Sequence, residues 1–403
     1  MKSERITFKN ADGITLSGRV DFPVAGSPKA FVLFAHCFTC GKNLISVDNI
    51  SRAMTQEGMA VLRFDFTGLG QSSGDFADSN FSSNLKDLEA AYEFMSKEYN
   101  APQIMMGHSL GGAAVLHISG KLEAVKAVIT VGAPSTPAHV KHILKNGEEA
   151  LQTKGEAEVN IGGRPFKMKK QFLDDLEEND SQDPIGNLGK PLLIMHSPID
   201  AIVGIDNATE IYLSAKHPKS FISLDDADHL LLKEVDSRYV GQVSASWASK
   251  YIIDQSEAKV APEGEVWVRM EGDNFTTEIM AGDHKMLADE PASVGGKDLG
   301  ASPYGYLLSA LGACTTMTLK MYADHKKIDL ESVEIQLIHD KIHVKDGENS
   351  ERPGAKIDQI KRKIKVTGNM SEEQKARMVE IADRCPVHKT LEGKPLIITE
   401  TYE

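Results

Sequence analysis

Six short apolar runs recur between about residue 31 and residue 252, separated by segments with helical spacing. A strand made of consecutive Val, Ile, Leu and Phe has no polar face, so it must be buried on both sides of a sheet. Such strands alternating with helices predict a mostly parallel sheet flanked by helices, an α/β architecture. The runs are residues 31–34, 61–64, 104–106, 127–131, 192–195 and 221–224.

A charged, helix-like stretch at residues 138–183 interrupts this alternation. It predicts either a cap over a site at the edge of the sheet or a peripheral crossover, and the pattern does not choose between them.

The pattern changes after residue 255. Residues 256–264 are small and polar, include a proline and lack an apolar period, which indicates a linker. We therefore predict one domain at residues 1–255 and a second, α+β domain at residues 265–403. In the second domain, alternating strands are expected at residues 266–269, 275–279, 333–338 and 364–366, and helices at residues 302–324 and 371–384.

Two helix starts in the second domain are marked by capping residues. Ser302 followed by Pro303 is a typical N-cap and first-turn pair, and Ser371 with Gln374 forms a capping box. If the last helix runs to about Arg384, then Cys385 lies at its C-terminal end, before a helix-stopping proline.

Composition narrows the classes of function. The 403 residues carry a formal net charge of −13 and lack clustered Lys and Arg, which argues against a nucleic-acid partner. The N-terminus lacks the pattern of an export signal, and no apolar run approaches the length of a membrane span. With four cysteines we expect a cytoplasmic protein with catalytic rather than structural thiols, and neither a cofactor nor a metal is predicted.

The sequence Gly107-His108-Ser109-Leu110-Gly111 follows a predicted strand and opens a helix of small residues. This is the strand, sharp turn and helix of a nucleophile elbow, in which the flanking glycines allow backbones to approach closely. Ser109 is therefore the candidate nucleophile, and the amide of Leu110 is a candidate oxyanion donor.

A serine nucleophile needs a base and an acid that orients the base. Asp200 follows one predicted strand and His229 follows the next, so the order Ser, Asp, His matches loops that meet at one edge of a sheet. Alternatives remain open: His196 as the base, or one of three other acids, Asp225, Asp226 and Asp228, as the orienting group. We interpret His108 as a loop residue.

On these motifs, residues 1 to about 252 resemble the α/β-hydrolase family, and residues 63–74 resemble its strand-and-turn signature. The resemblance implies that the amide of Phe38 is the second oxyanion donor. Cys37 stands where the family usually has glycine. Cys37 and Cys40 form a C-x-x-C pair without a prompt helix start, so we expect two unpaired thiols. The alternative is that their oxidation distorts the oxyanion hole and switches an esterase off.

Residues from about 263 to 403 resemble the OsmC/Ohr family of thiol-dependent hydroperoxide reductases. Four stretches carry this resemblance: residues 284–291, 295–300, 309–315 and 385–388, the last two with Cys314 and Cys385. The resemblance implies an intertwined homodimer, organic hydroperoxide substrates and a disulfide between the two cysteines during turnover.

By position Cys314 is the family's attacking cysteine. A C-terminal helix end would disfavour a thiolate at Cys385, which suits the resolving role. A nearby cation must offset burial of Cys314, with His284, His388, Lys389 and Arg384 as candidates. The chain departs from the family pattern at Tyr304, where a glutamate usually fixes an arginine, and in the upstream loop that lacks this arginine.

The sequence as a whole predicts a bifunctional enzyme. The first domain would cleave carboxylic esters at Ser109, and the second would reduce organic hydroperoxides at Cys314 and Cys385 with an external thiol reductant. The alternative is a redox-regulated esterase whose second domain is a sensor or a dimerisation module.

Overall fold

The chain folds into two compact units, one of residues 1–271 with 278–285 and one of residues 272–277 with 286–403. The computed structural model describes residues 2–23, 27–37, 39–161, 164–180, 183–253, 264–270, 275–282, 284–343 and 356–401. Apart from Gly264, the predicted linker at residues 256–264 lies outside these described residues.

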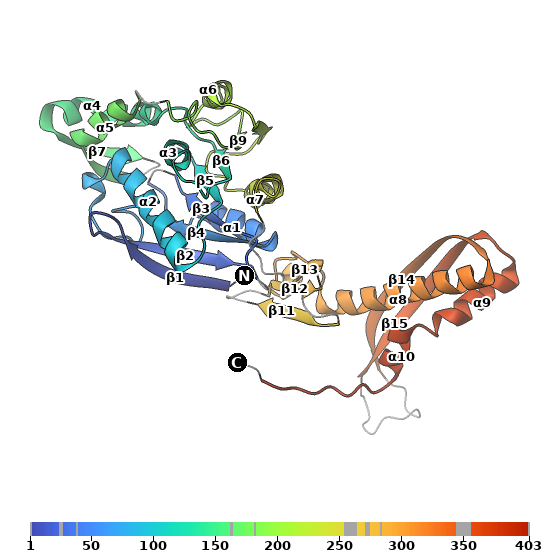
Figure 1. The fold of residues 1–403 in the computed structure, drawn as a ribbon. Coiled ribbons are helices and arrows are strands. Elements are labelled where there is room, and N and C mark those ends of the chain that lie inside the picture. The colour runs from blue at the N-terminus through green and yellow to red at the C-terminus, as the bar shows by residue number, and fades with distance from the viewer. Residues whose placement is uncertain are drawn as a thin grey trace. The chain divides into compact units, whose positions relative to one another are not determined.

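The first unit is built on an eight-stranded sheet ordered β1-β2-β4-β3-β5-β6-β9-β10 (Figure 1). β1 and β2 are antiparallel, and all neighbours from β4 to β10 are parallel. The mostly parallel sheet predicted from the apolar runs is confirmed. Its strands are β1 (Lys2–Lys9), β2 (Thr15–Phe22), β3 (Ala30–Ala35), β4 (Met59–Phe64), β5 (Ile104–His108), β6 (Ala127–Val131), β9 (Leu192–His196) and β10 (Lys219–Ser223).

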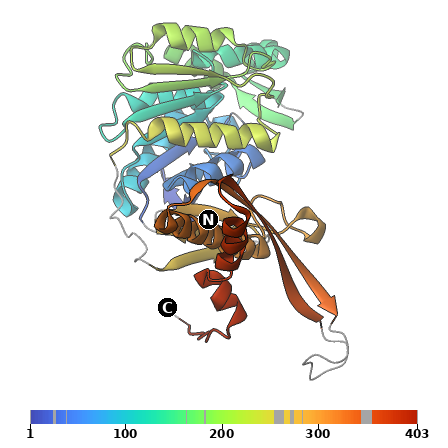
Figure 2. The ribbon, with the colours of Figure 1, turned by 90° about the vertical axis from the view of Figure 1, so that its right-hand side faces the viewer.

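Helices cover both faces of this sheet, as parallel strands without a polar face require. Apolar residues of α1 (Ile45–Gln56) and α7 (Glu234–Ala248) share one buried cluster on one face, and the two helices lie side by side (Figure 2). On the other face, α2 (Phe81–Glu98), α3 (Leu110–Ser119) and α6 (Asp206–Ser214) contribute to a second cluster. The central strands β3, β4, β5, β6 and β9 are thereby buried, and the carboxyl ends of the parallel strands meet at one edge.

The charged stretch after β6 contains more than the expected helices. It forms η2 (Pro137–Val140), α4 (Lys141–Lys154), a hairpin of β7 (Glu156–Ile161) and β8 (Arg164–Lys169), and α5 (Lys170–Asp180). The segment packs on η1 (Phe76–Asp78) and α2, where the rings of Phe76 and Phe166 are 5.1 Å apart and Asp175 accepts the amide of Ser82. Its role as a cap stays a prediction.

A three-stranded sheet follows, ordered β11 (Val266–Met270), β12 (Thr277–Ala281) and β13 (His284–Ala288). The sequence pattern predicted the first two of these strands but not β13. A loop after β13 is organised by the buried carboxylate of Asp289, which accepts the hydroxyl of Thr276 and the amides of Lys297 and Leu299.

The long helix α8 (Pro303–Lys326) packs along a two-stranded hairpin of β14 (Asp329–His343) and β15 (Lys356–Asn369), with α9 (Glu372–Ala382) against it (Figure 1). The predicted caps are confirmed, because Ser302 accepts the amide of Gly305 and Ser371 forms its capping box with Gln374.

The expected end of the last helix is wrong. α9 ends at Ala382, and a separate helix, α10 (Pro386–Glu392), begins with Cys385 as its N-cap. Pro386 occupies the first turn of α10, where its missing N–H is tolerated, so it starts a helix instead of stopping one.

Candidate active sites

The candidate nucleophile lies in a strained turn between β5 and α3. Ser109 has a φ of 54°, a conformation that a non-glycine residue adopts only when its surroundings hold it there. Its amide donates to the carbonyl of Val131 on the neighbouring strand at 2.9 Å. The backbone of β6 therefore holds the turn, and 6% of the Ser109 surface is exposed.

Glycine is required on both sides of this turn by close backbone contacts. A Cβ on Gly107 would lie 2.2 Å from the carbonyl oxygen of Gly111, and one on Gly111 would lie 2.4 Å from that of Ala35. Without side chains, α3 can start directly beside the ends of β3 and β5. This geometry is what the Gly-x-Ser-x-Gly spacing predicted.

Asp200 and His229 come from loops that follow β9 and β10; His229 contacts Ser109, and Asp200 contacts His229. His229 Nδ1 is 2.7 Å from Asp200 Oδ2, and His229 Nε2 is 3.0 Å from Ser109 Oγ. A carboxylate only accepts hydrogen bonds, so the proton of the neutral ring lies on Nδ1 and Nε2 faces the hydroxyl as an acceptor. The arrangement can take a proton from Ser109.

The alternative residues make other contacts. His196 Nε2 is 2.7 Å from the carbonyl oxygen of Val203 and 3.7 Å from Asp200 Oδ2. Asp226 pairs with Lys233 at the surface, and Asp228 accepts two backbone amides of its own loop. Among these acids, Asp200 is the one that the structure places against His229.

Backbone donors keep Asp200 ionised. Its Oδ1 accepts the amides of Ile202 and Val203, each at 2.9 Å. Burial alone would raise the pKa of Asp200, but the hydrogen bond from His229 and these two amides outweigh burial and lower it. The carboxylate thus stays negative and holds the imidazole in one orientation.

Two supporting residues escaped the sequence reasoning. His108 is buried rather than in a loop, and its Nε2 is 2.7 Å from the carbonyl oxygen of His229. Burial, with the neighbouring His229 ring, lowers the pKa of His108 to about 3, so it stays neutral. Gly132 has a φ of 53°, and a Cβ there would lie 3.3 Å from Asp200 Oδ2. Neither residue has a sequence signal apart from its strand-end position.

The loop after β3 differs from its prediction. Cys37 and Cys40 form a disulfide, so the expectation of two unpaired thiols is wrong. The reason is a tight turn, in which the amide of Cys40 donates to the carbonyl of Cys37 and the Cα atoms are 5.3 Å apart. The positive φ of this loop falls on Thr39, at 62°. Phe38 lies outside the described residues, and Leu110 begins α3, where first-turn amides lack helical partners.

A second group of reactive side chains lies in the second unit. Cys314 on α8 and Cys385 before α10 are free thiols that hydrogen-bond to one another. Cys385 is fully buried, and its Sγ accepts the backbone amide of His388 at 3.4 Å. The structure thus brings the two predicted cysteines together.

The two thiols have opposite pKa shifts. Burial raises the pKa of Cys314, and its hydrogen bond to Cys385 raises it further. Burial also acts upward on Cys385, but hydrogen bonds from Cys314, from the amide of His388 and from Thr315 outweigh it and lower the pKa of Cys385. The prediction that a helix C-terminus disfavours the Cys385 thiolate is therefore wrong, because Cys385 caps the N-terminus of α10.

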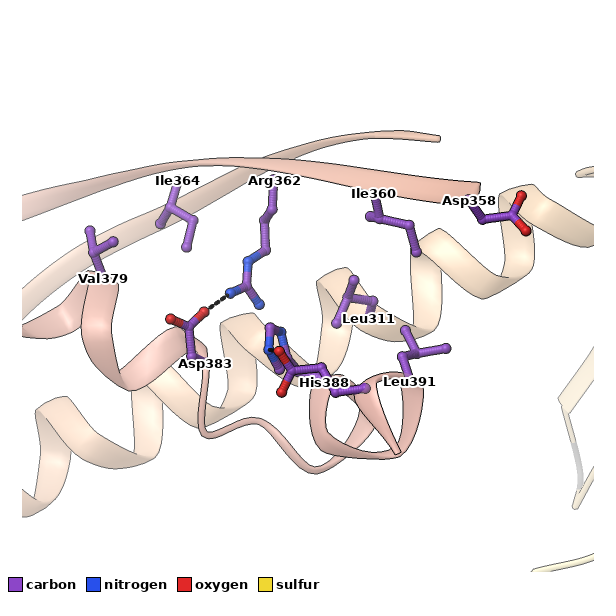
Figure 3. Close-up of a pocket in the computed structure, with 10 residues that line it drawn as sticks. Leu311, Asp358, Ile360, Arg362, Ile364, Val379, Asp383, His388 and Leu391 are labelled. Carbon is purple, nitrogen blue, oxygen red and sulfur yellow. Dashed lines mark hydrogen bonds and ion pairs between the residues drawn. The ribbon is translucent and has the colours of Figure 1, made fainter. Parts of the chain in front are cut away.

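A pocket of about 560 Å³ lies between α8, β15, α9 and α10, and His388, three residues after Cys385, is one of the residues that line it (Figure 3). Leu311 of α8, Ile360 of β15 and Leu391 of α10 supply apolar wall, and Arg362 of β15 points into the pocket toward Asp383. The pocket thus combines an apolar wall with charged groups, the cation of Arg362 and the carboxylates of Asp358, Asp383 and Glu392.

Comparisons with known proteins agree with the family resemblance of both domains. The family model described as serine aminopeptidase, S33 matches residues 26–157, and the model described as OsmC-like protein matches residues 295–400. The crystal structure of the esterase domain of a Rhodothermus marinus protein is 49% identical, covers 62% of this chain and 99% of its own, and superposes with a TM-score of 0.53. The chain belongs to the α/β-hydrolase family and carries an OsmC-like domain.

More distant relatives match the hydrolase domain. The uncharacterised protein YfhR of Escherichia coli K12 is 23% identical over 235 residues, which are 57% of this chain and 74% of that protein. The mitochondrial palmitoyl-protein thioesterase ABHD10 of Mus musculus is 24% identical over 207 residues, which are 49% of this chain and 64% of that protein.

In the OsmC-like domain, the candidate cations differ in what they do. His388 contributes its backbone amide to Cys385 while its ring lies 3.1 Å from Glu392. Tyr304, at the position of the usual glutamate, stacks on His339. A further cation, Arg362, contacts Thr315 of α8 and Ala382 of α9, and the sequence did not single it out because its strand alternates Lys and Arg with apolar residues.

Neither half offers a metal site in the described part of the chain, since no cluster of three or more His, Cys, Asp or Glu side chains there could hold an ion. None of the helices built from the described residues is both long and apolar enough to span a bilayer.

Proposed function

We propose that the α/β-hydrolase domain is a serine hydrolase that cleaves small carboxylic esters. The observation that carries this proposal is the continuous chain of hydrogen bonds from Asp200 through His229 to Ser109. An imidazole held in one tautomer by a buried carboxylate, and facing a serine hydroxyl, is the arrangement that activates an alcohol for acyl transfer.

The chemistry follows from these contacts. Ser109 Oγ attacks the ester carbonyl while His229 Nε2 takes its proton, and the imidazolium then gives that proton to the departing alcohol. Water attacks the acyl-enzyme by the same proton transfers in reverse and releases the carboxylic acid. We assign the amides of Leu110 and Phe38 to the oxyanion, which would place the developing charge at the start of α3.

Hydrolysis of 4-nitrophenyl acetate by the full chain tests this assignment. Ser109→Ala and His229→Gln should each lower kcat by at least about 10⁴-fold, because the nucleophile and its base act as a unit. Cys314→Ser is the control and should retain the activity. A fluorophosphonate probe should label the parent chain and not Ser109→Ala. Full activity in Ser109→Ala would overturn the proposal.

We further propose that the OsmC-like domain reduces organic hydroperoxides with Cys314 and Cys385. A thiolate attacks the terminal peroxide oxygen, forming a sulfenic acid and releasing the alcohol once its alkoxide takes a proton. The second thiol then displaces water from the sulfenic acid and forms the Cys314–Cys385 disulfide. An external thiol reductant returns both cysteines to thiols and is itself oxidised.

The order of attack has two candidates. The family resemblance assigns attack to Cys314, whereas the hydrogen bonds that converge on its partner favour a thiolate at Cys385. Trapping of the sulfenic acid in Cys314→Ser and in Cys385→Ser, followed by mass spectrometry, distinguishes them, because only the variant that keeps the attacking cysteine forms the adduct.

Peroxide turnover tests the activity itself. The parent chain should consume tert-butyl hydroperoxide catalytically with dithiothreitol, and the double variant Cys314→Ser/Cys385→Ser should not. Consumption that persists in the double variant would refute the assignment.

A sensor or dimerisation module is the second candidate for this domain. It is favoured by two exposed methionines on α8, Met317 and Met321, which are 65% and 72% exposed and would be covered in a homodimer. A disulfide that forms once without turnover would favour the sensor, and sedimentation of the full chain tests the dimer.

A further inference from the structure

Arg362 is a nearly buried cation beside the two cysteines. It lies on β15, the exposed fraction of its side chain is 12%, and it points across the pocket toward Asp383 (Figure 3). A guanidinium in such a position is held by specific partners, because burying an unpaired charge is unfavourable.

Those partners belong to the two segments that carry the thiols. Arg362 Nη1 donates to Thr315 Oγ1 at 3.0 Å and to the carbonyl oxygen of Ala382 at 3.1 Å. Thr315 is the residue after Cys314 on α8, and Ala382 is the last residue of α9, three positions before Cys385. One guanidinium thus joins the helix that carries Cys314 to the end of the helix that precedes Cys385.

Thr315 also connects Arg362 to the sulfur of Cys385. Thr315 Oγ1 accepts from Arg362 and donates its proton to the carbonyl oxygen of Leu311 at 2.7 Å, and a hydrogen bond with Thr315 lowers the pKa of Cys385. Thr315 and Cys385 are both fully buried, so bulk water does not compete for these bonds. The positive charge of Arg362 is therefore one hydroxyl away from the buried thiol.

We propose that Arg362 is a positioning residue for the Cys314–Cys385 pair, which holds the two thiols in reach of one another and places positive charge beside them. This inference rests on the proposed thiol chemistry of the OsmC-like domain. It assigns to a residue of β15 the cation that the upstream loop of this chain does not supply.

The other charged residues at this pocket supply a control variant for the test of Arg362. Asp358, Asp383 and Glu392 are acidic, and His388 pairs with Glu392. Asp383 is the ion-pair partner of Arg362, at 2.5 Å, and its side chain is 64% exposed. Asp383→Asn thus removes the ion pair and leaves the bonds of Arg362 to Thr315 and Ala382 in place, which makes it the matched control.

The first experiment measures disulfide formation in the full chain. Oxidised dithiothreitol converts the two thiols to a disulfide by exchange and is itself reduced to the dithiol, so no peroxide chemistry is needed. Arg362→Met should slow this reaction on the order of tenfold, the effect of losing charge-assisted bonds to both segments. Asp383→Asn should stay within about twofold of the parent chain.

The second experiment separates charge from structure. The ultraviolet absorbance of the thiolates is measured as a function of pH, and the double variant Cys314→Ser/Cys385→Ser supplies the background. This measurement needs no reagent that would have to reach the buried thiols. Arg362→Met should move the first thiol titration to higher pH, because the thiolate loses its nearby cation. Arg362→Lys should restore the titration but not the full exchange rate, because an ammonium lacks the planar fork that reaches both partners.

A wild-type exchange rate together with a wild-type titration in Arg362→Met would overturn the inference. If Arg362→Met does not fold, as judged by circular dichroism, Arg362→Lys decides, since unchanged exchange in that variant contradicts the bridge. Failure of the proposed peroxidase activity would show instead as absent peroxide turnover in the parent chain, and the exchange and titration would still report on Arg362.

Discussion

Replacement of Asp200 by asparagine tests the hydrolase site with almost no change of shape. In the protein, Asp200 Oδ1 accepts two backbone amides at 2.9 Å, and Oδ2 accepts His229 Nδ1–H at 2.7 Å. An asparagine oxygen must stay at the two backbone donors, because an amide NH₂ placed there would face two N–H groups. The NH₂ group of the substituted side chain therefore faces His229.

This orientation of the asparagine reverses the tautomer of the His229 imidazole. His229 Nδ1 must then accept a hydrogen bond, so the ring proton moves to Nε2, which lies 3.0 Å from Ser109 Oγ. A protonated Nε2 donates to the hydroxyl and cannot take its proton. We expect kcat to fall by about 10⁴-fold, which corresponds to about 5.5 kcal/mol of activation free energy, with KM little changed.

The assay is steady-state hydrolysis of 4-nitrophenyl acetate by Asp200→Asn, with circular dichroism to verify the fold. Asp226→Asn is the matched control, because Asp226 is exposed and pairs with Lys233 at the surface, and it should retain the parent kcat. A kcat for Asp200→Asn within about tenfold of the parent would show that this carboxylate does not fix the tautomer, and the reasoning would be wrong.

Three further predictions concern the surroundings of this site. Burial lowers the pKa of His108 to about 3 from an ordinary 6.5, so below pH 6.5 the unfolded chain binds a proton that the folded chain does not, and the free energy of unfolding falls as the pH falls. Between pH 7 and pH 5 this effect amounts to about 2 kcal/mol. Urea unfolding should show that the free energy of unfolding of His108→Gln falls by about 2 kcal/mol less than that of the parent chain over this range. The Cys37–Cys40 disulfide closes a short loop beside the oxyanion region, so dithiothreitol should lower the free energy of unfolding of the parent chain by about 2 kcal/mol and should also lower its kcat. Neither value should change in Cys37→Ser/Cys40→Ser. Equal responses of the two proteins would contradict a role for the disulfide. Gly111→Ala would put a Cβ 2.4 Å from the carbonyl oxygen of Ala35, so we expect a loss of about 1–3 kcal/mol in thermal unfolding together with reduced ester hydrolysis, and a variant with unchanged stability would disprove that contact.

Local chemistry let the sequence predict much of the first domain. Runs of consecutive apolar residues indicate strands buried on both faces, and the six parallel strands could be located from their runs, although β10, at the edge of the sheet, is partly exposed. The turn around Ser109 was predictable because close backbone contacts there tolerate only glycine at positions 107 and 111. Their positions after two predicted strands, together with chain order, suggested Asp200 and His229, since loops after parallel strands meet at one edge.

Tertiary structure decided what depends on contacts between distant segments. The hairpin of β7 and β8 escaped notice because its strands are short and charged, and their pairing, not their composition, holds them. The helix end near Cys385 was misjudged because Pro386 can stop one helix or start another, and only packing chooses.

Arg362 shows the same division between local and distant information. On its strand it looks like any solvated cation, and its partners on α8 and α9 lie 47 and 20 residues away in the chain. The sequence by itself determined which residues could do chemistry, because reactivity belongs to side-chain types and local turns. Only the folded chain decided which of them have charged or hydrogen-bonded neighbours, because those neighbours come from segments that a linear pattern does not connect.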